Sequence, residues 1–121
     1  MADKLMFNCT WGKADAERAT LPFVAANVAA LAGQEAIVVC TIEAVWLGTS
    51  GGGDGIASPG LPAFNDLYDE FVGNGGKVWL CGACVKPRGI TEAQLRAGSM
   101  IVGAARVVEE VVNGARSIAF A

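Results

Sequence analysis

Residues 36–42 read Ala-Ile-Val-Val-Cys-Thr-Ile, a run of apolar and β-branched side chains without regular polar alternation. A strand that is buried on both faces has this composition, and such strands are typical of parallel sheets. Two further runs, residues 5–9 and 77–81, are largely apolar and have the length of strands. The central run therefore predicts a parallel sheet with helices packed on both of its faces.

Helical segments separate these runs. The first is rich in alanine and ends before Gly33, with Asp15 or Thr20 as its candidate cap. Residues 91–95 begin like another helix, with Thr91 as its cap, and residues 100–102 fit either type of element. The remaining expectations are helices over residues 14–31, 61–72 and 104–112, and a last strand over residues 117–120.

Strands that alternate with helices, without a repeat or a linker, predict one α/β domain over residues 1–121. The expected architecture has three layers around a mostly parallel sheet. In open α/β sheets, ligands bind beyond the carboxyl ends of the strands. Cys9, Cys40 and Cys81 each fall at or near such an end. For Cys9 and Cys40 we favour a second interpretation, in which they are small apolar side chains of the core.

The composition narrows the classes of partner. The chain is 53% hydrophobic and only 17% charged, which favours burial of apolar surface between copies of the chain, with a well-filled core as the alternative. Lysine and arginine do not cluster, so neither nucleic acid nor an anionic membrane is an expected partner. The apolar stretches fall short of the roughly 20 residues that span a membrane. Residues 1–4 do not resemble the start of a secretory signal, so a cytoplasmic location is predicted.

The chain has no histidine and four cysteines, so sulfur is the expected agent of any chemistry near neutral pH. The segment from Cys81 to Ile90 places two thiols, two cations and two turn-forming residues in ten positions. A thiolate is the reactive form of cysteine, and nearby cations and backbone amides stabilise it. We expect Cys81 and Cys84 to be catalytic, with a stabilising role for Lys86, Arg88, Gly82 and Ala83.

A pocket is expected at the same edge of the sheet. Its candidate lining residues are Cys9, Trp11, Cys40, Glu43 and Trp46. The Gly-rich residues 48–55 lack the Gly-Lys-Ser/Thr of a phosphate-binding loop and are expected to form a mobile flap over the strand ends. The loop after the first strand lacks the hydroxyl run of a flavin-phosphate loop, and no cofactor or metal is predicted.

The segment from Cys81 to Ile90 resembles the DsrE/DsrF-like sulfur-relay family, which includes the TusD-type sulfur carriers. Members commonly place a cysteine at the end of this strand, eight residues before the glycine of an Arg-Gly pair, as Cys81 and Gly89 are here. The resemblance extends to Glu43-Ala44-Val45-Trp46-Leu47 and to the closing residues 114–120. It implies a flavodoxin-like (DsrEFH-like) fold, trimers or hexamers, and a persulfide carried on Cys81.

These observations leave several functions open. The predicted one is a sulfur carrier or sulfurtransferase in which Cys81 relays sulfane sulfur, with donor and acceptor proteins or small thiols as partners. A second hypothesis is a thiol–disulfide or peroxide-reducing protein that uses Cys81 and Cys84; Pro87 follows too soon for the long helix of thioredoxin-type enzymes. A third is a metal site made of four thiolates, and a fourth is a non-catalytic oligomeric binding module.

Overall fold

The computed structural model describes residues 3–120. Residues 1 and 2, on which part of the expectation about a secretory signal rests, lie outside this range. The elements follow one another as β1 (Lys4–Cys9), α1 (Ala16–Leu31), β2 (Glu35–Cys40), the 3-10 helix η1 (Ile42–Gly48), α2 (Phe64–Gly73), β3 (Lys77–Cys81), α3 (Gly82–Val85), the 3-10 helix η2 (Glu92–Gln94), β4 (Ser99–Val102), α4 (Ala104–Val112) and β5 (Arg116–Ala119).

The strands of residues 3–120 form one five-stranded sheet in the order β4-β3-β2-β1-β5, and every pair of neighbours is parallel. The predicted α/β fold with a parallel sheet is confirmed. In flavodoxin the first strand lies between the second and third strands, whereas β1 here lies between β2 and β5. From β1, the strands β2, β3 and β4 are therefore added one after another toward one edge of the sheet, and the chain then crosses through α4 to place β5 on the other side of β1.

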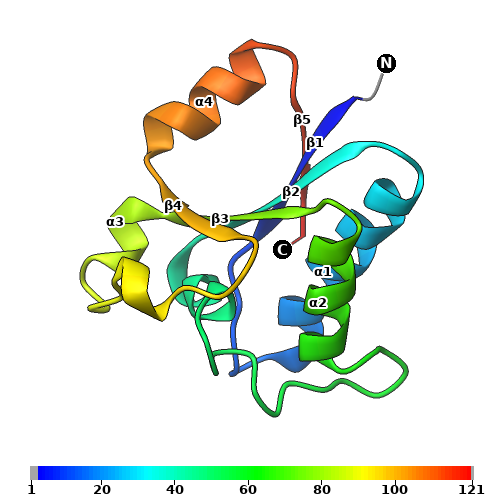
Figure 1. The fold of residues 1–121 in the computed structure, drawn as a ribbon, viewed down its shortest axis with the longest axis vertical. Helices are drawn as coiled ribbons and strands as arrows, with labels where there is room; N and C mark the ends of the chain where they lie inside the picture. Colours follow the sequence, from blue (N-terminus) through cyan, green and yellow to red (C-terminus); the bar gives the residue numbers. More distant parts are fainter. Residues whose placement is uncertain (1–2, 121) are drawn as a thin grey trace.

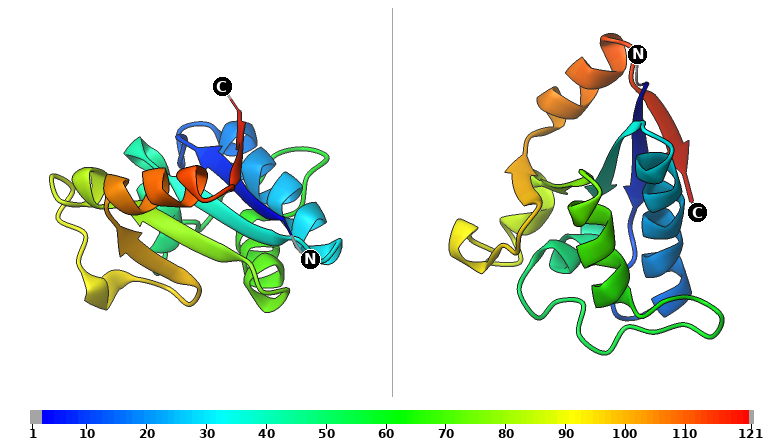
Figure 2. Two further views of the ribbon diagram at one scale, coloured as in Figure 1. Left: turned by 90° about the horizontal axis from the view of Figure 1, so that it is seen from above. Right: turned by 45° about the vertical axis from the view of Figure 1, so that its right-hand side comes forward.

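Helices cover both faces of the sheet, which confirms the expected three layers. Figure 1 shows α1 and α2 side by side on one face and α4 on the other, and the views in Figure 2 agree. The core under α1 and α2 contains a cluster of aromatic rings around Phe23, whose centroid lies 4.9 Å from that of Phe64. The opposite face is smaller, and Trp79 and Ile37 are among its buried side chains.

The local sequence explains the main boundaries. Asp15 caps α1, because its carboxylate accepts a hydrogen bond from the amide of Arg18 at 3.0 Å. The strand expected over residues 36–42 stops at Cys40, since η1 begins at Ile42. The undecided residues 100–102 belong to β4.

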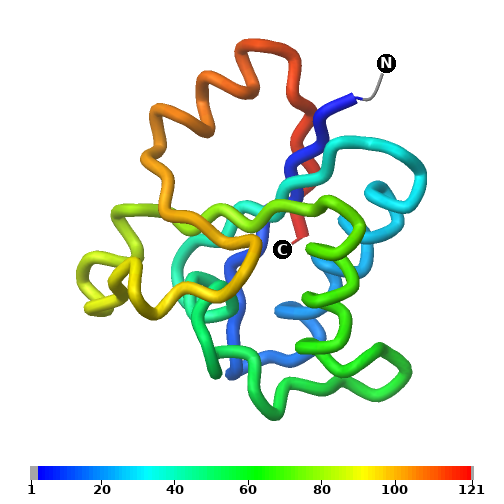
Figure 3. Tube along the Cα trace, viewed as in Figure 1, coloured from blue at the N-terminus to red at the C-terminus, as the bar shows by residue number. Residues whose placement is uncertain are grey.

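Two expected helices are shorter than their patterns indicate. The one over residues 61–72 begins only at Phe64. The one after Thr91 is the single turn η2, which Thr91 and Gln94 close with a reciprocal capping box. Figure 3 shows how the chain between β3 and β4 loops out beside the carboxyl end of β3 before it returns to the sheet. Within residues 3–120 no helix is both long and apolar enough to cross a membrane.

Candidate functional site

Three cysteines lie at the carboxyl edge of the sheet. β1, β2 and β3 end at Cys9, Cys40 and Cys81, respectively. Cys9 and Cys40 are direct neighbours in the parallel register, and Cys40 lies opposite Leu80, one residue before Cys81. Because the carboxyl ends of parallel strands form the usual ligand-binding edge, a reactive thiol is expected at this edge.

Cys81 lies at the junction between β3 and α3. Its backbone is still extended, and the helical turn begins at Gly82. The chain then folds back on itself, with the amide of Lys86 donating to the carbonyl of Gly82 at 3.3 Å and the amide of Ile90 donating to the carbonyl of Val85 at 3.2 Å. Val85 and Ile90 are buried and fix this loop to the core. Cys81 is half-buried, and its backbone is held by the turn that follows it.

Arg88 connects the cysteine segment to η1. Its Nε donates to Oε2 of Glu43 at 2.7 Å, and one of its terminal nitrogens donates to the carbonyl of Cys84 at 3.0 Å. The pair is partly exposed, so its net free energy is small, about 0–1 kcal/mol. Its effect is geometric, because it holds the turn of α3 against η1. Lys86 is exposed, and among residues 3–120 it forms no salt bridge.

The two thiols of the C-x-x-C pair differ in their surroundings. Both are half-buried. Cys84 packs against the main core, together with residues such as Leu95 and Ile101, whereas Cys81 is not part of that contact. Of the remaining predicted stabilising residues, Gly82 is half-buried and Ala83 is exposed beside them. Of this pair, Cys84 thus packs against the main core and Cys81 does not.

Cys9 and Cys40 lie in the core and line no pocket that we find in residues 3–120. The Cys9 sulfur is 3.7 Å from the carbonyl oxygens of both Trp11 and Ala19, within range of a weak S–H···O hydrogen bond. The hydrogen bond between the two thiols, together with burial, raises the pKa of Cys40 well above its ordinary value. Cys9 and Cys40 therefore serve as small core side chains rather than as lining of a pocket, and Cys40 stays protonated at neutral pH.

The four thiols do not converge. Cys9 and Cys40 are buried, while Cys81, the last residue of β3, and Cys84, in α3, are half-buried. In the described part of the chain no group of three or more cysteine, aspartate or glutamate side chains is placed to hold a metal ion. This arrangement contradicts the hypothesis of a four-thiolate metal site.

The buried thiol predicts a loss of stability at alkaline pH. Cys40 has an ordinary pKa of 9.0, and burial likewise raises the pKa of Tyr68 above its ordinary 10.0. Both groups stay protonated in the folded state but ionise in the unfolded chain, so their stabilisation is complete below about pH 9 and declines above it. We expect urea unfolding to show a falling free energy from about pH 9 upward, less steeply in Cys40→Ala. A flat profile to about pH 11 would contradict this account.

The turn between β2 and η1 is strained. Ile42 has a φ of 56°, the left-handed region that a β-branched residue rarely adopts. Such a conformation costs on the order of 1–3 kcal/mol and persists only where the surroundings enforce it, often at ligand sites. Here the amide of Thr41 donates to the carbonyl of Cys9, and the amide of Ala44 donates to the carbonyl of Thr41. This turn leads from the end of β2 into η1, which carries Glu43.

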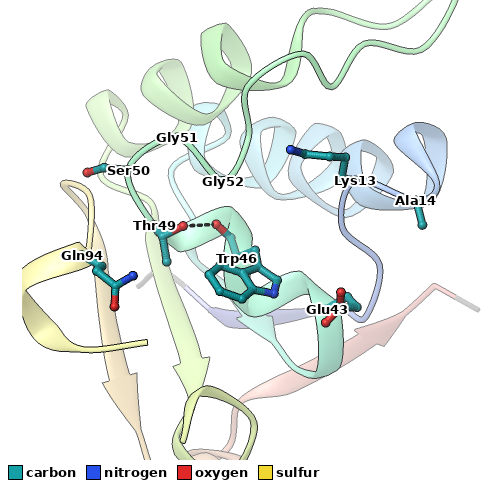
Figure 4. A pocket seen from close by; sticks show the side chains of 9 residues that line it. All are labelled: Lys13, Ala14, Glu43, Trp46, Thr49, Ser50, Gly51, Gly52 and Gln94. Atoms are coloured by element: carbon teal, nitrogen blue, oxygen red, sulfur yellow. Dashed lines mark hydrogen bonds between the residues drawn. The ribbon is translucent and has the colours of Figure 1, made fainter. Parts of the chain in front are cut away.

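A pocket of about 430 Å³ opens beside η1. Figure 4 shows the indole of Trp46 in its centre, with Lys13 and Glu43 on one side and Gln94 on the other. Of the residues expected in a pocket, Glu43 and Trp46 are brought together here. Trp11 is exposed elsewhere, under the guanidinium of Arg18 at 5.5 Å from its ring. The full lining is Lys13, Ala14, Glu43, Trp46, Thr49, Ser50, Gly51, Gly52 and Gln94.

The Gly-rich loop is fastened at its beginning, which differs from the expected flap. The amide of Ser50 donates to the carbonyl of Gln94 at 2.8 Å, and Thr49 forms an isolated antiparallel bridge with Leu95. Gly52 packs so tightly that a Cβ atom there would lie 1.7 Å from the carbonyl oxygen of Trp46. A side chain at this position would push the loop off η1 and reshape the pocket.

Some lining residues escaped prediction because they come from separate parts of the chain. Lys13 follows β1, Ser50 belongs to the Gly-rich loop and Gln94 ends η2. A signal was present for Gln94, which stands three residues after Thr91 in the spacing of a capping box. For Lys13 the sequence offers no signal beyond its place after the first strand.

The DsrE/DsrF-like family matches residues 3–120. The chain belongs to the DsrE/DsrF-like family. This family is generally related to sulfur relay. A DsrE/DsrF-like assignment agrees with the place of Cys81 at the end of β3 and with the resemblance in the segment that follows it.

Two solved structures share the fold of this DsrE/DsrF-like chain. The ychN protein from E. coli superposes with a TM-score of 0.79 at 16% identity, covering 98% of this chain and 99% of that one. MTH1491, a protein of unknown function from Methanobacterium thermoautotrophicum, gives 0.73 at 18% identity with 98% and 99% covered. At these identities the likeness shows the fold. The uncharacterised protein MJ0760 from Methanocaldococcus jannaschii is 29% identical over 102 residues, which are 84% of this chain and 37% of that protein. The chain therefore spans little more than a third of that relative's length.

Proposed function

We propose that this chain is a cytoplasmic sulfur carrier or sulfurtransferase that holds sulfane sulfur as a persulfide on Cys81. The observation that carries the proposal is the setting of this thiol at the carboxyl end of β3. It is half-buried on a fixed turn, and unlike Cys84 it does not pack against the main core. Membership of a family related to sulfur relay supports the same chemistry.

The reaction has two balanced steps. In the first, the Cys81 thiolate attacks the outer sulfur of a donor persulfide, the donor S–S bond breaks, and the donor leaves as a thiolate. In the second, an acceptor thiolate attacks the outer sulfur now held on Cys81, and Cys81 leaves as a thiolate. No external oxidant or reductant is consumed. The exposed ammonium of Lys86 and the amides of Gly82 and Ala83 are proposed to stabilise Cys81 as a thiolate and as a persulfide anion.

Arg88 has a different part in this proposal. Its guanidinium donates hydrogen bonds to Glu43 and to the Cys84 carbonyl, so it acts by positioning the turn that presents Cys81.

A relay assay tests the proposed function. The protein is loaded with a small-molecule persulfide, freed from the donor and then mixed with a thiol acceptor. We expect persulfide to leave the protein in proportion to the acceptor that becomes persulfidated. Protein that takes up no sulfur, or that keeps it in the presence of excess acceptor, would contradict the proposal.

We further propose that copies of the chain assemble, as a trimer or hexamer, through the exposed side of α4. None of the residues of α4 is buried, and Val107 alone of its four valines packs against the sheet. The other three, Val108, Val111 and Val112, are between 47% and 78% exposed, and we call them the α4 surface. Three adjoining exposed valines on one short helix are typical of a surface that a second copy covers.

Charged substitutions on the α4 surface should dissociate the assembly. We expect light scattering after gel filtration to report several subunits for the wild type and a single subunit for Val111→Glu with Val112→Glu, because carboxylates would be buried without partners. Val28→Glu is the matched control, since Val28 is 63% exposed on α1, on the other face of the sheet. Dissociation by Val28→Glu instead, or a wild type that is a monomer, would contradict this surface.

A further inference from the structure

The pocket beside η1 is lined by two oppositely charged side chains, Lys13 and Glu43, that can each still form a hydrogen bond with a ligand. Lys13 forms no salt bridge with any residue between 3 and 120. Glu43 accepts the Arg88 hydrogen bond through Oε2, while no described residue donates to its Oε1. Lys13 and Glu43 are not paired with each other within 4.0 Å, although Figure 4 shows them on the same side of the Trp46 indole. The pocket wall thus offers one cation and one carboxylate oxygen to the same ligand.

The rest of the pocket is already shaped. A volume of about 430 Å³ falls in the range of sites for small molecules. Trp46 supplies a flat apolar wall, and the close fit of Gly52 against its carbonyl keeps the facing loop in place. Gln94 accepts a hydrogen bond from the amide of Thr91 at 2.8 Å through its side-chain oxygen, so its NH₂ group is left to donate to a ligand.

We propose that this pocket binds the α-amino-acid head group of a small thiol, and that this thiol is the acceptor of sulfur from Cys81. The ligand carboxylate meets Lys13, and the ligand ammonium meets Oε1 of Glu43. Such charge-assisted hydrogen bonds are stronger than neutral ones and distinguish a zwitterion from a molecule with one charge. The acceptor role rests on the proposed function, whereas the binding does not.

The pocket and the reactive segment form one hydrogen-bonded unit. Glu43 binds Arg88, and Arg88 binds the carbonyl of Cys84, so the wall that holds the ligand ammonium also holds the turn after Cys81. In the transfer, the bound thiol gives its proton to water and attacks the outer sulfur of the Cys81 persulfide. The S–S bond to Cys81 breaks, Cys81 leaves as a thiolate, and the ligand leaves as a persulfide.

Binding is tested without the reaction, by an NMR titration of Cys81→Ser with S-methyl-L-cysteine. We expect shifts of the Gly51 and Gly52 amides and of the Trp46 indole. Methylthiopropionate, which lacks the amine, and S-methylcysteamine, which lacks the carboxylate, should each bind about tenfold more weakly. Lys13→Gln and Glu43→Gln should each weaken the binding of S-methyl-L-cysteine to a similar extent.

Lys77→Gln provides the matched control for the charge change. Lys77 begins β3 and pairs with Glu35 at 3.6 Å, so it lies at the other end of the strand from Cys81. We expect this variant to bind S-methyl-L-cysteine as the starting protein does. Absence of shifts at the pocket, or equal binding of all three ligands, would overturn the pocket's specificity whether or not Cys81 carries sulfur.

The acceptor role is tested separately on loaded protein with native Cys81. L-Cysteine should remove the persulfide faster than cysteamine or mercaptopropionate does, and Lys13→Gln should abolish that preference. Equal rates for the three acceptors, after correction for their free thiolate, would overturn the acceptor role. Failure of Cys81 to load at all would instead remove the proposed function, while the titration would still decide the ligand of the pocket.

Discussion

Cys81→Ser is expected to abolish sulfur transfer, whereas Cys84→Ser should retain most of it. A serine hydroxyl cannot form a persulfide, and Cys81 is the half-buried thiol at the end of β3 that lies outside the main core contacts. Cys84 packs against that core, so its loss changes packing more than chemistry. The relay assay measures both variants at equal concentrations of folded protein, with donor in excess.

The same pair of variants separates two chemistries. A disulfide mechanism needs both thiols, because one attacks and the other resolves. Equal loss of activity in Cys81→Ser and Cys84→Ser, with an internal disulfide in the wild type after mild oxidation, would replace the persulfide mechanism by thiol–disulfide exchange. Full transfer by Cys81→Ser would contradict both mechanisms.

Phe23→Ala should cause a large loss of stability. Phe23 is fully buried in α1, and its ring centroid lies 4.9 Å from that of Phe64 and 5.8 Å from that of Tyr68. Removal of a buried phenyl ring costs about 3–5 kcal/mol, because the transfer free energy is lost and a cavity remains. A domain of this size has a total stability of roughly 5–15 kcal/mol, so the variant keeps a much smaller margin.

Urea unfolding at one fixed protein concentration measures this effect, since assembly would make stability depend on concentration. Val28→Ala is the control, because Val28 is 63% exposed on α1, outside the α4 surface, and surface changes usually stay within about 0.5 kcal/mol. A loss of less than about 1 kcal/mol in Phe23→Ala would mean that the space around Phe23 collapses. It would then contradict a close-packed interface between α1 and α2.

The central strands could be predicted because a strand that is buried on both faces consists almost entirely of apolar residues, as residues 36–42 do. The end of that strand could not, since it depends on the positive φ of Ile42, which the surrounding backbone imposes. α4 shows a similar limit. Its apolar stripe predicts a helix correctly, but only Val107 packs on the sheet, and the pattern does not distinguish a buried face from a face that a second copy would cover.

The sequence allowed the cysteines of the candidate site to be predicted, but not the side-chain contacts between distant parts of the chain. Cys81 stands out locally through its C-x-x-C pair and the Arg-Gly that follows. The partner of Arg88 is Glu43, 45 positions earlier in the chain, and only the folded sheet brings the two together. Lys13 and Gln94 meet at the pocket for the same reason, because they belong to loops that share one edge of the sheet. Long-range assembly of this kind leaves no periodic signal in a sequence.

The most direct test is to locate the sulfur on the wild-type protein. After incubation with a persulfide donor, persulfides and thiols are trapped by an alkylating reagent, and the digested peptides are examined by mass spectrometry with and without reduction. We expect one additional sulfur atom on Cys81, which is lost on reduction, and no additional sulfur on Cys9 or Cys40. Additional sulfur on Cys84 with none on Cys81, or a Cys81–Cys84 disulfide without any added sulfur, would contradict the persulfide mechanism.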